Sequence, residues 1–266
     1  MIITLTSDFG LKDHYVGALK GMIYSRFPSA RLVDISHEIS PFVIQEAAYV
    51  IGSSYHYFPE KTIHLVLTDA EFSAEKRPIL VFWNNHYFLS ADNGVMSLVI
   101  AGQKPEAIIA LPFENNQNST EFFVKTAIEL AHGKSIFEMG ETIFSLKEMQ
   151  PLKAVISEDK TKITGSIIYI DRFGNAISNI SKELFEQIHK GREFDILFRS
   201  YRITKIHPTY IDYASEKNAT DGGKLAIFNQ AGLLEIALYK GNSRSGGTAS
   251  SLLGIEHESS ISIVFR

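Results

Sequence analysis

The sequence predicts an α/β domain with a mainly parallel sheet, followed by a small β-barrel domain. Strand-like and helix-like patterns alternate through the first 149 residues, which is the rhythm of a parallel sheet with crossover helices. Helical periodicity largely disappears after Pro151, where short alternating stretches separated by turn residues take over. The chain has 266 residues, which is long for one domain. We therefore expect a Rossmann-like domain over residues 1–149 and a barrel domain over residues 150–266.

The first strand, turn and helix place the first candidate site residue. Residues 2–5 favour a strand, the chain then reads Ser-Asp-Phe-Gly, and residues 13–27 carry apolar side chains at helical spacing. Asp8 should therefore lie just beyond the carboxyl end of a strand, where ligands bind in open α/β sheets. An aspartate at such a place can also simply bond the backbone of its own turn. Position alone leaves both interpretations open.

The next elements continue this alternation. Ser40 followed by Pro41 predicts the start of a helix, because serine caps helix N-termini and proline suits the first helical position. A strand at residues 62–68 then delivers Asp69 to the same sheet edge as Asp8, if the crossovers have their usual right hand. The carboxylates of Asp8 and Asp69 would then lie at the same edge of the sheet.

The rest of this domain is predicted from turn and cap residues. A hairpin is expected over residues 78–89 with its turn at Asn84 and Asn85, whose side chains tolerate positive φ. A helix over residues 121–131 should end at Gly133, because glycine is the common residue just past a helix C-terminus.

The second domain is predicted from short strand-like segments bounded by turn residues, a pattern typical of a small barrel or sandwich. The segments are residues 163–170, 194–198, 201–206, 224–229, 233–239 and 260–265. A short helix is expected at residues 182–190, and the polar, glycine-rich residues 241–248 should form an exposed loop.

Composition and motifs exclude several function classes. The formal net charge of −4 lacks the basic excess of nucleic-acid-binding proteins, and the absence of cysteine excludes thiolate nucleophiles and cysteine-ligated zinc. The nine histidines show no metal spacing, so we expect no metal site and expect His37 and His132 on the surface or at helix caps. No phosphate-binding glycine motif or serine-hydrolase elbow occurs. With no signal peptide or membrane span in the pattern, we expect a cytoplasmic protein without nucleic-acid or membrane partners.

The most informative stretch of the second domain is Tyr-Ile-Asp-Arg-Phe-Gly-Asn at residues 169–175. If this stretch is extended, Asp171, Phe173 and Asn175 project to one face, because strand side chains repeat every two residues. An acceptor, an aromatic plane and an amide would suit a nucleoside-like ligand. Asp, Gly and Asn are also all common in β-turns, so the residue types alone leave a turn open as well.

Several motifs occur in order along the chain. They are Thr-Leu-Thr-Ser-Asp-Phe-Gly at residues 4–10, Asp13, Tyr-Val-Gly at 15–17, Val-Asp-Ile-Ser-His at 33–37, Tyr-Phe-Pro at 57–59, Asp-Asn-Gly at 92–94, the stretch at 169–175, and Leu-Glu-Ile-Ala at 234–237. With them the chain resembles the S-adenosylmethionine (SAM) hydroxide adenosyltransferase family, which is related to the bacterial fluorinase and chlorinase. The resemblance spans nearly the whole chain.

The resemblance implies a homotrimer that holds SAM between neighbouring subunits as substrate, with no separate cofactor. In that family pattern, Asp8 matches the aspartate that grips the ribose hydroxyls. Asp171 matches the carboxylate near the methionine amino group, and Phe173 and Asn175 match the residues that contact adenine. Hydrolytic members convert SAM and water to adenosine and methionine by attack at the ribose C5′ carbon.

The chain departs from the hydrolytic members where their water is bound. Their loop D-P-G-V-G-T-x-R-R reads Asp-Ala-Glu-Phe-Ser-Ala-Glu-Lys-Arg at residues 69–77, and their later F-H-G-R-D motif corresponds to Gln-Asn-Ser-Thr-Glu here. Asp69 is kept, Lys76 replaces the arginine, and Asn118 replaces the histidine. Lysine is a point charge rather than a planar fork, and asparagine does not titrate near neutral pH.

The sequence thus predicts a SAM hydrolase, slowed by these replacements, with Asp69, Lys76 and Asn118 as catalytic residues. Two alternatives stay open. One is a protein that binds SAM or adenosine without turnover, and the other acts on another nucleoside-type substrate through Glu71 or Glu121. Halogenation is disfavoured, because the Asp69 carboxylate would repel a halide.

Overall fold

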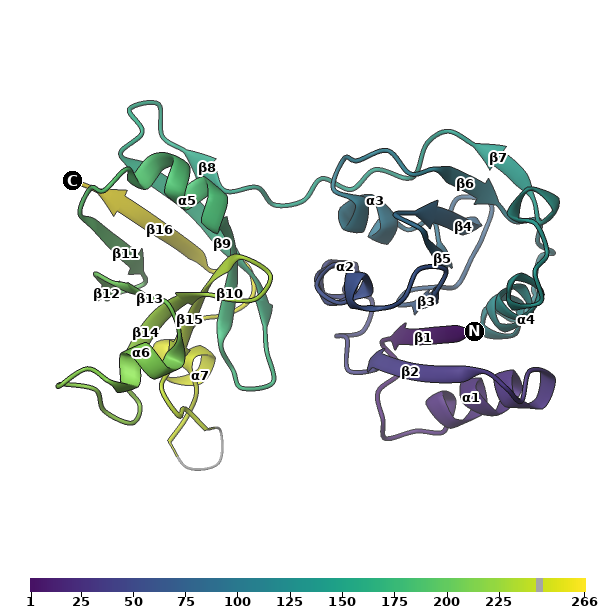
Figure 1. The fold of residues 1–266 in the computed structure, drawn as a ribbon, viewed down its shortest axis with the longest axis horizontal. Coiled ribbons are helices and arrows are strands. Elements are labelled where there is room, and N and C mark those ends of the chain that lie inside the picture. The colour runs from purple at the N-terminus through teal and green to yellow at the C-terminus, as the bar shows by residue number, and fades with distance from the viewer. Residues whose placement is uncertain (243–245) are drawn as a thin grey trace. The chain divides into compact units, whose positions relative to one another are not determined.

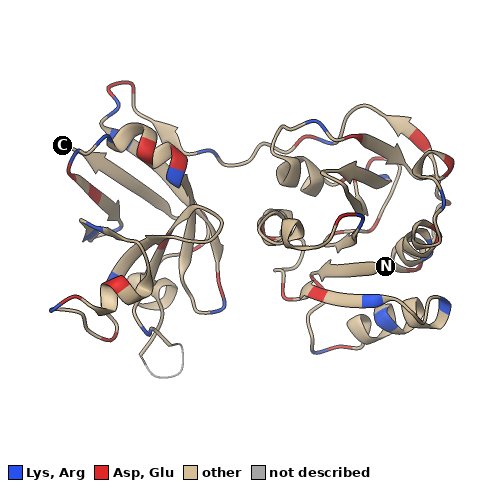
Figure 2. Cartoon of the chain, viewed as in Figure 1, with Lys and Arg blue, Asp and Glu red and all other residues tan. Residues whose placement is uncertain are grey.

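The computed structural model describes residues 1–242 and 246–266. The chain forms two compact units, Met1–Pro151 and Leu152–Arg266 (Figure 1). Each unit has its own hydrophobic core. Residues 243–245, within the loop expected over residues 241–248, lie outside the described residues. Acidic and basic residues are interspersed over both units (Figure 2). None of the helices in the described ranges combines the length and the hydropathy that a membrane crossing needs.

The first unit is built on a seven-stranded sheet in the order β2-β1-β3-β5-β4-β6-β7. Its neighbours β2, β1, β3 and β5 are parallel, whereas β4 runs antiparallel to β5 and β6, and β7 antiparallel to β6. The strands are β1 (Ile2–Ser7), β2 (Arg31–Ser36), β3 (Ile63–Leu67), β4 (Pro78–Trp83), β5 (His86–Ala91), β6 (Ala107–Ala110) and β7 (Glu141–Ile143).

Helices cover both faces of this sheet (Figure 1). Helices α1 and α4 pack with one set of buried strand residues, and α2 and α3 pack with another set. This is the layered arrangement predicted for the first domain. The helical segments are α1 (Tyr15–Arg26), α2 (Ile44–Gly52), α3 (Val95–Ile100), α4 (Ser119–Ala131), and the 3₁₀ turns η1 (Tyr55–Tyr57) and η2 (Ile136–Glu138).

The two strands that lead into the candidate site are β1 and β3. Both are buried at nearly every position, as parallel strands covered on both faces are. Ser7 pairs with Leu67 in the parallel register. The chain segments that carry Asp8 and Asp69 therefore leave the sheet at neighbouring points.

The predicted hairpin is confirmed, and the predicted helix start at Ser40 is wrong. Asn84 and Asn85 connect β4 to β5 with φ of 51° and 61°. Helix α2 begins only at Ile44, without a side-chain cap. The Ser40 backbone N–H instead donates to the Glu46 carboxylate at 2.8 Å, so a turn precedes the helix.

The second unit is a nine-stranded sheet that curls into a nearly closed barrel (Figure 1). Its strand order is β12-β11-β16-β9-β10-β15-β14-β13, with β8 paired to β9. The strands are β8 (Val155–Ile156), β9 (Lys162–Ile170), β10 (Ala176–Ser181), β11 (Phe194–Phe198), β12 (Tyr201–Ile203), β13 (Ile206–His207), β14 (Lys224–Phe228), β15 (Leu233–Leu238) and β16 (Ser260–Phe265). The helices are α5 (Lys182–His189), α6 (Tyr210–Ala214) and α7 (Ala249–Leu253).

Candidate active site

Asp8 lies at the end of β1 and joins two other loops. Its Oδ2 accepts hydrogen bonds from the backbone N–H groups of Phe42, at 2.9 Å, and Asp69, at 3.4 Å. These donors lie 34 and 61 residues away in the chain. Asp8 is therefore not bonded only within its own turn, because it ties the loops that follow β2 and β3 to the end of β1.

Asp69 and Lys76 form an ion pair beside this point. Lys76 Nζ donates to Asp69 Oδ1 at 2.8 Å and to the Asp69 carbonyl oxygen at 3.1 Å. Asn93 Nδ2 donates to the same carbonyl oxygen, at 3.1 Å. Asp69 has a φ of +46°, a left-handed conformation that aspartate tolerates better than most residues. The lysine and the backbone contacts together hold Asp69 in that conformation.

An open cavity of about 1340 Å³ lies in the first unit, at this edge of the sheet. Asp8, Asp69 and Asn118 all line it. Lys76 reaches this rim through its contacts with Asp69. Aromatic side chains also line the cavity, namely Phe9, Tyr15, Phe42, Phe72, Phe113 and Phe123. An apolar wall with a few convergent polar groups is the usual composition of a small-molecule site.

Asn118 has a structural role that explains its residue type. It is the N-cap of α4, and its Oδ1 accepts a hydrogen bond from the Glu121 backbone N–H at 2.9 Å. Glu71 and Glu121 line the same cavity, and both are exposed. Two of the three candidate catalytic residues, Asp69 and Asn118, therefore line one cavity, although Asn118 is already engaged in the helix cap. Lys76 does not line the cavity itself and contacts it only through Asp69.

In the second unit, residues 171–175 adopt the β-turn, one of the two arrangements that the sequence left open, and not the extended arrangement. These residues form the turn between β9 and β10, and Gly174 has a φ of +75°. Asp171 Oδ1 accepts hydrogen bonds from the backbone N–H groups of Phe173, at 2.8 Å, and Asn175, at 2.9 Å. The Phe173 side chain is 69% exposed, whereas Asn175 is only 8% exposed. Asp171, Phe173 and Asn175 are thus held by a side-chain-bonded turn rather than by strand alternation.

This turn is fixed from outside by the start of α7. The Ser250 backbone N–H donates to the Gly174 carbonyl oxygen at 2.9 Å. A Cβ atom added to Gly174 would lie 2.3 Å from the Thr248 Cβ, which is far inside van der Waals contact. Position 174 therefore requires glycine both for its φ and for this close approach.

Two residues that the sequence did not suggest complete the polar contacts of Asn175. Asn175 Nδ2 donates to Asp171 Oδ2 at 3.0 Å and to the Tyr210 hydroxyl at 3.1 Å. The Tyr210 hydroxyl in turn donates to Glu235 Oε1. Burial raises the pKa of Glu235, and burial together with this hydrogen bond raises the pKa of Tyr210. A carboxylate inside the otherwise apolar pattern of β15 was the sequence signal that could have identified Glu235.

The histidines differ in burial. His132 is exposed at the C-cap of α4, as expected, but the surface or cap position expected for His37 is wrong. His37 is buried, and its Nδ1 lies 2.7 Å from Ser7 Oγ. His64 is also buried, between Thr4 and His86, and burial lowers its pKa to about 3. Within the described ranges, no cluster of three or more His, Asp or Glu residues is arranged to hold a metal ion.

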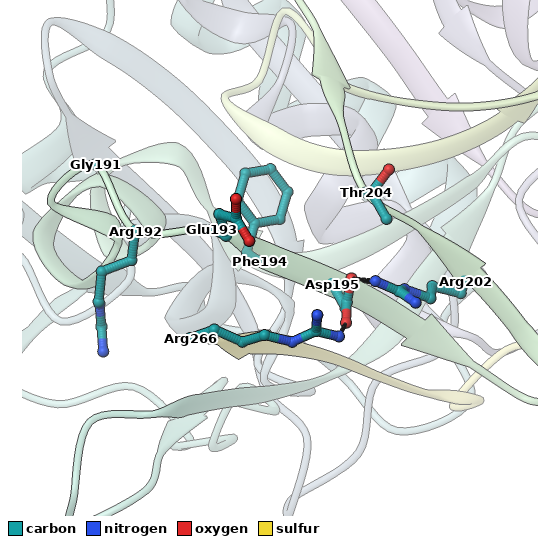
Figure 3. Close-up of a pocket in the computed structure, with 8 residues that line it drawn as sticks. All are labelled: Gly191, Arg192, Glu193, Phe194, Asp195, Arg202, Thr204 and Arg266. Atoms are coloured by element: carbon teal, nitrogen blue, oxygen red, sulfur yellow. Dashed lines mark hydrogen bonds and ion pairs between the residues drawn. The ribbon is translucent and has the colours of Figure 1, made fainter.

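A smaller cavity of about 350 Å³ in the second unit has a different character (Figure 3). Asp195 lies between Arg202, whose Nε donates to it at 2.7 Å, and Arg266, which contacts its other oxygen. These ion pairs connect β11 with β12 and with the end of β16. The carboxylate is already matched by two guanidinium groups, so we assign this cluster to the stability of the barrel.

Both units match models of one protein family. Residues 3–140 match the SAM hydroxide adenosyltransferase N-terminal domain, and residues 165–262 match the C-terminal domain of the same family.

Individual relatives extend over almost the entire chain. A protein from Methanocaldococcus jannaschii named (R)-S-adenosyl-L-methionine hydrolase is 30% identical over 99% of this chain and 96% of its own length. A protein of the same name from Thermus thermophilus is 25% identical over 90% of this chain and 92% of its own length. A fluorinase from Nocardia brasiliensis is 24% identical over 71% of this chain and 74% of its own.

A solved structure confirms the predicted fold. The crystal structure of an uncharacterized conserved protein from Thermotoga maritima superposes with a TM-score of 0.84 at 26% identity, covering 99% of this chain and 100% of that one. With both halves matched by the family models and a 30% identical relative covered almost end to end, this chain belongs to the SAM hydroxide adenosyltransferase family.

Proposed function

We propose that this protein is a SAM hydrolase, which converts SAM and water to adenosine and methionine. The family membership and the names of the full-length relatives support this activity. The observation that carries the proposal is the meeting of Asp8 and the Asp69–Lys76 pair at one cavity of the first unit. A carboxylate pair at the carboxyl edge of a parallel sheet can serve both substrate binding and water activation.

In this proposal the catalytic residues act on water. Asp69 accepts a hydrogen bond from the attacking water, and Lys76 holds the Asp69 carboxylate in place through their ion pair. Asn118 lines the same cavity and contacts that water. Attack forms the C5′–O bond while the C5′–S bond breaks, and the bonding pair returns to sulfur as neutral methionine thioether. The water proton passes to Asp69 and then to solvent. The sulfonium is already a good leaving group, so no acid is required.

Substrate binding is assigned to the four residues that match the family pattern. Asp8 binds the ribose hydroxyls, and Asp171 lies near the methionine amino group. Phe173 packs on the adenine ring, and Asn175 hydrogen-bonds its edge. The 69% exposed Phe173 ring supports this role, because an aromatic side chain of that exposure has free surface for stacking.

We propose that the protein acts as a cytoplasmic homotrimer, with SAM as substrate and with no cofactor. Size-exclusion chromatography with light scattering measures the oligomeric state, and a monomer would contradict the trimer.

A second candidate function is a binding protein that holds SAM or adenosine without turnover. One observation favours it: Asn118 Oδ1 is engaged in the α4 cap and Lys76 Nζ in the ion pair with Asp69, so both side chains already have partners within the protein. The deciding experiment incubates purified protein with SAM, separates adenosine and methionine by chromatography, and measures SAM binding by calorimetry.

Adenosine and methionine in equal amounts would establish the hydrolase, and Asp69→Asn should abolish them. Glu141→Gln is the control, because Glu141 is exposed in the same unit and does not line the cavity. Binding without product would favour the second candidate. Absence of both binding and product would contradict both candidates.

A further inference from the structure

The polar contacts around Asn175 fix which end of its amide is free. Asp171 Oδ2 lies 3.0 Å from the amide atom assigned as Nδ2. An ionised carboxylate only accepts hydrogen bonds, so its neighbour must be the NH₂ group and not the carbonyl oxygen. The Asp171 carboxylate is itself oriented by two backbone N–H donors of the turn. The assignment of the oxygen and the nitrogen of the Asn175 amide therefore follows from the hydrogen bond to Asp171 and not only from the positions of the atoms.

Tyr210 and Glu235 independently require the same orientation of the Asn175 amide. The Tyr210 hydroxyl donates its one proton to Glu235 Oε1. Its oxygen can then only accept from Asn175, and the second hydrogen of Nδ2 meets that need at 3.1 Å. Glu235 is 6% exposed, so water does not readily replace it as the acceptor. Both hydrogens of the Asn175 amide are used inside the protein, and its carbonyl Oδ1 is the group left for a ligand.

We propose that Tyr210 and Glu235 are positioning residues that present Asn175 Oδ1 as a fixed acceptor, and that this makes the site select 6-aminopurine over 6-oxopurine nucleosides. The inference rests on the proposed function, in which Asn175 contacts the purine edge. A 6-amino group donates to a carbonyl oxygen, whereas a 6-oxo group places a second acceptor against it. A site built to bond one polar group rejects an analogue that leaves its groups unpaired.

The test compares calorimetric dissociation constants for adenosine and inosine, which differ at this ring position. Wild type should prefer adenosine by about tenfold or more, the cost of one unmade hydrogen bond in a buried site. Tyr210→Phe should lower that ratio at least threefold, mainly by weakening adenosine. The matched control is Tyr213→Phe, because Tyr213 lies on the same helix and its buried hydroxyl contacts Thr220 instead. The control should keep the wild-type ratio.

A second pair of variants covers the case in which Tyr210→Phe does not fold. Glu235→Leu removes the acceptor of the Tyr210 proton and should lower the ratio, and Glu235→Gln should restore most of it, because its amide oxygen can still accept. Equal binding of adenosine and inosine by wild type would overturn the inference, as would an unchanged ratio in Tyr210→Phe or Glu235→Leu. In these cases hydrolysis of SAM by wild type would leave the proposed function standing. A wild type that neither binds nor hydrolyses SAM and does not bind adenosine would overturn both.

Discussion

At the scale of single residues, Asp8 combines a structural contact with a place at the cavity. Its Oδ2 accepts from two backbone N–H groups that belong to different loops, and the side chain lines the cavity of the first unit. A carboxylate offers about four lone-pair sites in total. Two backbone bonds therefore leave acceptor capacity for ribose hydroxyls.

Replacing Asp8 by alanine should weaken SAM or adenosine binding by about 1.5 to 3 kcal/mol, the range for a hydrogen bond with a charged partner. Isothermal titration measures the loss. Glu141→Ala is the control, because Glu141 is exposed and lies outside the cavity lining. Wild-type affinity in Asp8→Ala would contradict the assignment of Asp8 to substrate binding.

The lysine and asparagine at positions 76 and 118 should make turnover slow. We expect Lys76→Arg combined with Asn118→His to raise the hydrolysis rate by about tenfold or more, beyond the product of the single changes, because groups that act as a unit are not additive. Initial rates of adenosine formation measure this effect.

The histidine change also removes the α4 cap, which costs about 1 kcal/mol, so thermal unfolding of each variant must be measured beside its rate. Asn118→Ser is the matched control, because serine keeps a cap without adding a titratable group. A double variant slower than a fast wild type would show that other groups activate the water.

At the scale of elements, the turn between β9 and β10 depends on Gly174. Gly174→Ala should destabilise the protein by about 2 kcal/mol or more, since a left-handed alanine costs about 1 to 2 kcal/mol and its Cβ would also overlap Thr248. Urea unfolding gives the free energy.

Gly191→Ala is the matched control, because Gly191 has a similar φ of +80° but nothing within 4 Å of an added Cβ. The difference between the two variants isolates the contact with Thr248. Equal losses in both would mean that this contact carries no energy.

A second element-scale feature is the buried histidine pair across β1, β3 and β5. His64 Nδ1 lies 2.7 Å from Thr4 Oγ1, and His64 Nε2 lies 3.1 Å from His86 Nδ1. Burial lowers the pKa of His64 to about 3, against 6.5 for an unburied histidine. Between these two values the unfolded chain binds a proton that the native protein does not.

The free energy of unfolding should therefore fall as pH drops from 6.5 toward 3, by up to about 1.4 kcal/mol per pH unit from His64. His64→Gln keeps hydrogen-bonding groups but does not titrate, so its stability should fall less steeply over that range. Urea unfolding at pH 7, 6, 5 and 4 compares the two slopes. Parallel slopes would show that His64 is not the responsible group.

The sequence predicted helices, strands and turns correctly where their formation depends only on the local residues. The β4–β5 hairpin follows from Asn84 and Asn85, because their tolerance of positive φ is a property of the residues themselves. Features set by distant contacts were not predictable. The backbone N–H of Ser40 bonds Glu46 and not a helix turn, and His37 is buried against Ser7, which lies 30 residues away.

The candidate site likewise contains residues that the sequence could place and residues whose contacts depend on distant parts of the chain. Asp8 and Asp69 could be placed on one rim because parallel strands bring their carboxyl ends together. Tyr210 could not be found from the sequence, because its hydrogen bond to Asn175 joins segments 35 residues apart in the chain. Glu235 stands out as a carboxylate within the apolar pattern of β15, but its hydrogen bond to Tyr210 joins segments 25 residues apart, so its role could not be inferred.

At the scale of the whole molecule, each unit has its own core and should fold alone. A fragment covering residues 1–151 should unfold in a single cooperative transition, as expected for a domain of that size. It lacks Asp171, Phe173 and Asn175, so it should bind adenosine more weakly than the full chain. Circular dichroism and calorimetry check the two expectations, and full-chain affinity in the fragment would contradict the binding roles of those three residues.

The long-range bonds of Asp8 also bear on the thermodynamics of ligand entry. Two loops at the end of the parallel strands are already tied to β1 by one carboxylate. Ordering of those loops is therefore completed during folding and does not oppose association. Calorimetry should find a small entropic penalty for adenosine binding to wild type. In Asp8→Ala that penalty should grow, so part of its lost affinity will be entropy of the loops and not the enthalpy of the missing contact.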